Sequence, residues 1–120
     1  MCLVYFVCFP LIGIECMPPD RQVIECEMHV KSVPGLLEEV RYCKERFSIL
    51  CKENDKQKEL GLFYRAAWHA TYEIGEHIVA VIPCKIISDE RMVQLENCKI
   101  FAEKLFLEIQ MMLGEFLCSL

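Results

Sequence analysis

Three side chains on one predicted helix have the residue types of a metal site. His69, Glu73 and His77 follow one another at intervals of four residues, so on a helix all three lie along one face. Imidazole nitrogens and a carboxylate are ordinary zinc ligands. On one straight helix, however, these three ligands span about 12 Å, which is too far for one ion. Only an adjacent pair could share a metal, and the solvated face of an amphipathic helix is the simpler interpretation. We therefore predict neither a metal nor another cofactor.

The same face suggests a second kind of chemistry, because Arg65 precedes His69 by about one turn. This pair resembles the arginine and histidine of helical ribonuclease domains of the HEPN type, which are also small helical bundles. Those domains separate the two residues further and place them near the end of a late helix. No activity is carried over from the resemblance. A small hydrolase or ribonuclease that uses His69 remains an alternative, and the prediction is a protein that is not an enzyme and has no catalytic residue.

Nine cysteines are the unusual feature of the composition, and no two of them form a CxxC pair. This spacing excludes the commonest zinc-finger and thioredoxin-like signatures. Several of the cysteines, such as Cys43 and Cys98, stand where a helix needs an apolar side chain. A buried free cysteine behaves as a small hydrophobic residue. The sequence therefore favours reduced thiols in a cytoplasmic or nuclear protein.

An alternative begins in residues 1–16, which carry a single charge and have the length of a secretory signal's apolar core. Their removal would leave six cysteines, an even number that suits a secreted, disulfide-bonded signalling protein of the helical cytokine kind. Against this, the segment lacks a basic start and a small-residue cleavage site, and Pro10 and Glu15 interrupt it. Residues 1–16 are thus either a signal peptide or a core strand. They are too short to span a bilayer, so we predict no transmembrane helix.

Length and charge restrict the function classes. A chain of 120 residues has the size of one domain with one core, so we treat residues 1–120 as a single domain. The net charge of −5 argues against nucleic acid as a partner, because phosphate neutralisation needs an excess of basic residues.

The first 31 residues have a β-like pattern. After an apolar run ended by Pro10, apolar and polar residues alternate, with Ile24, Cys26, Met28 and Val30 on one side and Glu25, Glu27 and His29 on the other. Strict alternation is typical of a half-buried strand. Residues 1–31 are therefore predicted to form a short β-hairpin or an extended apolar segment.

The remainder is helical by its three-four periodicity. We predict helices over residues 34–53, 55–82 and 88–119, arranged as a three-helix antiparallel bundle that makes the fold mainly α. Pro34 is placed to begin the first helix, Pro83 ends the second, and Ser88 is a good N-cap for the third.

The last helix has more apolar residues than one core needs. A three-four seam begins at Leu95 and reaches Phe116, widened by Leu113 and Leu117, and a second apolar line of Ile100, Leu107 and Met111 lies near the opposite face. Trp68, at the border of the second helix's apolar face, either packs in the core, which is the commoner case, or anchors a partner. Either the N-terminal residues or another chain must cover the second line.

The sequence therefore predicts a protein–protein interaction module or small adaptor. It would bind another protein, or a second copy of itself as an oligomer, through the last helix and the apolar N-terminus. The candidate contact residues are Ile100, Leu107, Met111, Leu113, Leu117 and Trp68.

Overall fold

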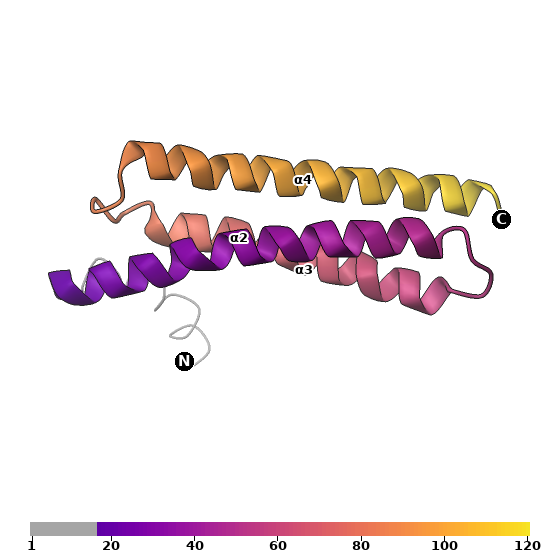
Figure 1. Cartoon of the computed structure of the whole chain (residues 1–120), viewed down its shortest axis with the longest axis horizontal. Coiled ribbons are helices and arrows are strands. Elements are labelled where there is room, and N and C mark those ends of the chain that lie inside the picture. Colours follow the sequence, from indigo (N-terminus) through magenta and orange to yellow (C-terminus); the bar gives the residue numbers. More distant parts are fainter. Residues whose placement is uncertain (1–16) are drawn as a thin grey trace, which may run out of the picture.

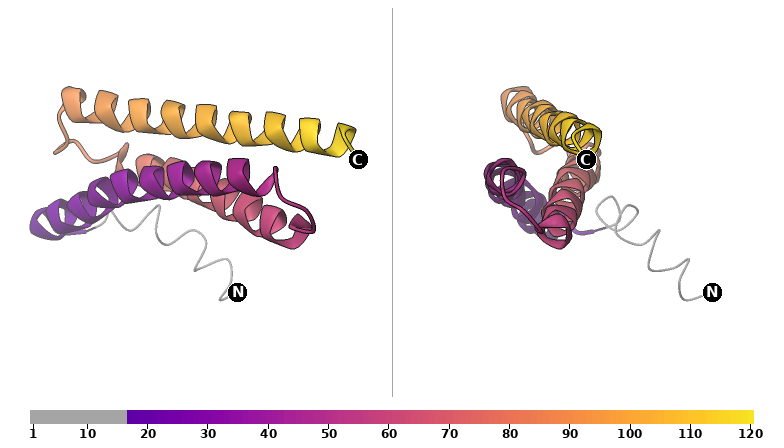
Figure 2. Two further views of the ribbon diagram at one scale, coloured as in Figure 1. Left: turned by 45° about the vertical axis from the view of Figure 1, so that its right-hand side comes forward. Right: turned by 90° about the vertical axis from the view of Figure 1, so that its right-hand side faces the viewer.

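Three long helices make up the computed structural model, which describes residues 17–120. They are α2 (Pro19–Leu50), α3 (Gln57–Val81) and α4 (Asp89–Cys118). Each helix runs antiparallel to the one before it, and near end-on the three lie at the corners of a triangle (Figures 1 and 2). The prediction of a three-helix antiparallel bundle is confirmed. The apolar run of residues 1–16 lies outside the described residues, as does the question of whether it is a signal peptide or a strand.

The predicted strand over residues 23–30 is wrong, because α2 begins at Pro19 and continues through this segment. Cys26 is buried, whereas Ile24 and Met28, which the alternation placed on the same face, are each 58% exposed. Cys26, Val33, Leu37 and Val40 are the buried positions here, and their spacing of seven, four and three residues is helical. The helical period of the longer segment prevails over a local alternation of four apolar residues.

Pro34 lies inside α2 and does not begin it. A proline in a helix interior removes one backbone hydrogen bond and crowds the preceding turn. Packing on both sides of this turn, where Val33 and Leu37 are buried, keeps the two halves in one helix. Tertiary contacts therefore override the helix-start signal of Pro34.

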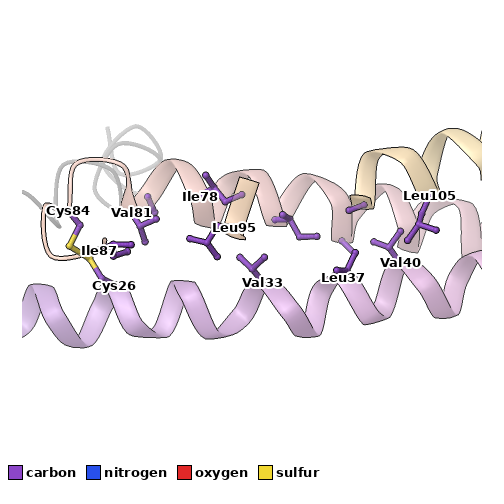
Figure 3. Close-up of a cluster of buried hydrophobic side chains, with 14 residues drawn as sticks. Cys26, Val33, Leu37, Val40, Ile78, Val81, Cys84, Ile87, Leu95 and Leu105 are labelled. Atoms are coloured by element: carbon purple, nitrogen blue, oxygen red, sulfur yellow. A yellow bond between two sulfur atoms is a disulfide. The ribbon is translucent and has the colours of Figure 1, made fainter. Parts of the chain in front are cut away.

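The core lies along the axis of the bundle in two clusters. One, shown in Figure 3, occupies the half where α3 ends and α4 begins, and includes Val33, Ile74, Ile78 and Leu95. The other occupies the opposite half and is centred on Phe47 and Ile109, which are both fully buried. The three-four seam of α4 supplies Leu95, Ala102, Leu105 and Ile109 to these clusters, as its spacing predicts.

A disulfide and two ion pairs join α2 to other parts of the bundle. A disulfide bonds Cys26 of α2 to Cys84, which follows α3. Arg91 donates to both carboxylate oxygens of Glu27, at 2.7 and 3.3 Å. Lys44 Nζ and Glu108 Oε2 lie 2.6 Å apart. The expectation that every thiol is reduced is therefore wrong for Cys26 and Cys84, because the helix turns Cys26 toward the α3–α4 connection.

The start of α4 follows its sequence signal. Ser88 caps α4 by accepting a hydrogen bond from the backbone N–H of Arg91 at 3.2 Å, with Asp89 and Glu90 in the first turn, where negative charge is favourable.

None of the helices in residues 17–120 contains a stretch that is long and apolar enough to cross a membrane.

Candidate interaction groove

A groove runs along the seam between α3 and α4. Of the three helix pairs, α3 and α4 are packed least closely, and the main hollow between them has a volume of about 690 Å³. Its apolar lining comes from Trp68 and Val79 of α3 and from Phe106 and Leu107 of α4. A second hollow of about 310 Å³ follows where α3 begins and α4 ends. We call the two hollows together the α3–α4 groove.

Tyr64 marks the boundary between the two hollows. Its ring packs against Phe106 with centroids 5.2 Å apart, and its hydroxyl accepts a hydrogen bond from Gln110 Nε2 at 3.3 Å. The hollow beyond it is lined by Leu60, Leu113, Phe116 and Leu117, among others. Both hollows therefore belong to the same seam, and α2 lines neither of them.

Trp68 and Tyr72 form an aromatic platform in the main hollow. Their rings are stacked, with centroids 5.5 Å apart and planes inclined by 13°, although Trp68 is 47% and Tyr72 56% exposed. A hydrogen bond to Glu76 and the negative charge of its carboxylate raise the pKa of Tyr72. The phenol therefore stays neutral and keeps its donor at physiological pH.

The residues predicted as a partner surface divide between the groove and its rim. Trp68 and Leu107 line the main hollow, and Leu113 and Leu117 line the second. Ile100 and Met111 are each 60% exposed and lie close to Leu107 around the helix, at the outer rim. Trp68 is not buried in the core, which was the commoner of the two expectations, because nearly half of it is exposed.

The structure does not bring the predicted metal trio together. His69 and Glu73 are exposed on α3, and the ring of His69 lies edge-on to Trp68 with centroids 5.0 Å apart. Within residues 17–120 no group of three or more His, Cys, Asp or Glu side chains could hold an ion. Arg65 is likewise exposed.

His77 instead meets a histidine of α2 that the sequence did not connect with it. Its Nδ1 lies 2.7 Å from Nδ1 of His29 on α2, and both rings are partly buried. Burial and the nearby His77 lower the pKa of His29, while the charge of Glu25 acts in the opposite direction. The predicted strand turned His29 away from Cys26, whereas the helix places the two one turn apart. The helical period, extended back through residues 23–30, would have placed His29 on the same side of the helix as Cys26.

No family model, curated protein or solved structure matches this chain. The α3–α4 groove is a described feature of the chain that could receive another molecule.

Proposed function

We propose that the protein is a non-enzymatic interaction module that binds an amphipathic helix in the α3–α4 groove. The helix belongs either to another protein or to a second copy of this chain. The observation that carries the proposal is the groove itself, with aromatic and aliphatic side chains exposed along a seam that α2 does not cover. An apolar groove between two helices is a standard receptor for the apolar face of a third.

The dimensions of the groove support a helical occupant. Its lining on α3 extends from Gln57 to Val79, which corresponds to about 33 Å at the rise of an α-helix. A partner helix of about six turns would fill this length. Added to α2, α3 and α4, it would complete a four-helix arrangement, which buries the apolar surface that three helices leave exposed.

The lining also has the composition of an interaction surface. Trp68 and Tyr72 are the residue types most often found at the energetic centres of protein interfaces. Lys99 and Glu103 of α4 and Glu76 of α3 place charges of both signs along the groove. Apolar contacts would supply most of the affinity, and the charges would select the orientation of the partner helix.

Trp68 allows occupancy of the groove to be measured directly, because it is the single tryptophan of the chain. We would first measure molar mass by light scattering over a range of concentrations, and then titrate the protein with helices selected from a displayed library of amphipathic peptides. Self-association or peptide binding should shift Trp68 emission to shorter wavelength as water leaves the groove. Trp68→Ala, followed by calorimetry, should weaken binding about 30-fold or more if Trp68 is an energetic centre.

Charge substitutions separate the groove from general surface effects. Leu107→Glu and Met111→Glu should abolish binding. Ile24→Glu is the matched control, because Ile24 is 58% and Leu107 55% exposed but Ile24 lies on α2, outside the groove. The proposal fails if the protein is a strict monomer and no selected helix shifts Trp68 emission, or if Leu107→Glu and Ile24→Glu have equal effects.

A second candidate is a secreted, disulfide-bonded signalling protein, and the Cys26–Cys84 bond favours it. Disulfides persist mainly in oxidising compartments. This candidate predicts a mature chain that begins near Met17 and has no titratable thiol, whereas four cysteines of residues 17–120 are free in the structure. Intact mass of the protein from its native source, measured with and without alkylation, distinguishes it from the first candidate.

A further inference from the structure

A pair of histidines forms a polar contact between α2 and α3. His29 and His77 are 48 residues apart in sequence, yet their Nδ1 atoms lie 2.7 Å from one another. The ring centroids are 5.0 Å apart and the planes are inclined by 52°. The rings are therefore not stacked, and the Nδ1 atom of each ring faces the Nδ1 atom of the other.

We propose that His29 and His77 supply the two protein ligands of a zinc site that joins α2 to α3. Zinc binds imidazole nitrogen at about 2.0–2.1 Å. Two such nitrogens at a tetrahedral angle are about 3.3 Å apart. The observed pair would have to separate by about 0.6 Å, which small rotations of two partly buried rings can provide. Zinc would take the place of the proton that two neutral imidazoles share in an N–H···N bond, and this proton would move to Nε2 of the ring that carried it.

The choice of metal follows from the ligand type. Imidazole suits zinc and its neighbours in the transition series, whereas magnesium and calcium prefer oxygen ligands. Glu25 lies one turn before His29 on α2, and its charge acts on that ring, which favours a cation there. Because residues 17–120 contain no set of three protein ligands, water would complete the coordination sphere.

The surrounding structure holds the two ligands in place. Cys26, three residues before His29, is bonded to Cys84, seven residues after His77. The disulfide thus fixes the relative position of α2 and α3 within two helical turns of the histidines. A site whose ligands are already positioned loses less conformational freedom when the ion binds.

Zinc titration of the full chain tests the proposal. We would measure binding by competition with a chromophoric chelator and expect one bound zinc ion. His29→Ala and His77→Ala should each lower the affinity for zinc by at least about tenfold, because even the loss of a second-shell partner costs about 10- to 100-fold in metal affinity. His69→Ala is the matched control, since His69 is the remaining histidine of the chain and is exposed on the same helix as His77. It should leave zinc binding unchanged.

A second measurement identifies the ligand atoms. Zinc should shift the side-chain Nδ1 resonances of His29 and His77 in long-range proton–nitrogen spectra and leave those of His69 in place. The proposal is overturned if no zinc binds, if zinc binds equally well to His29→Ala and His77→Ala, as it would at free thiols, or if His69→Ala weakens binding as much as they do. Circular dichroism of each variant verifies that the helices remain folded.

Discussion

Removal of the Cys26–Cys84 disulfide should destabilise the bundle substantially. The two cysteines are 58 residues apart in sequence, and the bond prevents the unfolded chain from separating them. For a loop of this length the chain-entropy model gives about 4 kcal/mol at 25 °C. In a domain of this size that corresponds to a fall of about 15–20 °C in Tm. Since the free energy of unfolding of a whole domain is about 5–15 kcal/mol, the effect is large enough to measure by urea unfolding or by thermal unfolding.

The assay is urea unfolding of the wild type and of the double variant Cys26→Ala, Cys84→Ala, followed by circular dichroism. Reductant should lower the stability of the wild type to that of the double variant and should not affect the double variant. Cys118→Ala is the control, because Cys118 is a free and exposed thiol, and it should match the wild type. If complete reduction, verified by mass, leaves the unfolding midpoint of the wild type unchanged, the loop-closure argument is refuted.

Three further predictions concern the core, an ion pair and the interior proline. Ile74→Ala should cost about 2–5 kcal/mol in urea unfolding because Ile74 is fully buried, whereas Ile82→Ala should cost far less because Ile82 is 61% exposed. The hydrogen bond and charge of Arg91 lower the pKa of Glu27 in the folded protein. This pair therefore stabilises the fold at pH values above the pKa of the carboxyl in the unfolded chain, near 4.5. The stabilisation is lost as the pH falls through the lower pKa of the folded state. Arg91→Gln should therefore reduce the loss of stability on acidification, measured as Tm against pH, and an unchanged slope would contradict this. Pro34→Ala should raise the stability of α2, by up to about 3 kcal/mol, because alanine restores a backbone donor; a lower unfolding midpoint in urea would show that the proline is needed.

Periodicity predicted most of the fold because the helices are long. The seam of α4 kept its spacing from Leu95 to Phe116, and its residues lie where the period placed them. The beginning of α2 was predicted wrongly because four alternating residues and Pro34 are both local signals. The helical period of the longer segment decides the conformation there, and the disulfide of Cys26 with Cys84 has no signature in either segment.

The α3–α4 groove could be predicted only in part from the sequence. The surplus apolar line of α4 was visible from Ile100, Leu107 and Met111, but the side of the bundle on which it would lie depends on how α3 and α4 pack. The sequence correctly placed Trp68 at the border of the apolar face of its helix. Its stacking on Tyr72 is visible only in the structure. His29 could not be paired with His77, because a contact between two helices depends on their register, which one sequence does not specify.

The position of the disulfide divides the bundle unequally. The covalent loop from Cys26 to Cys84 contains most of α2 and all of α3, whereas α4 lies wholly outside it. Side-chain contacts and two ion pairs, Arg91–Glu27 and Lys44–Glu108, hold α4 in place. The least costly partial opening of the molecule is therefore the departure of α4 from a hairpin that stays cross-linked. Amide protons of α4 should exchange with solvent before those of α2 and α3, and two molecules could trade their last helices without breaking a covalent bond.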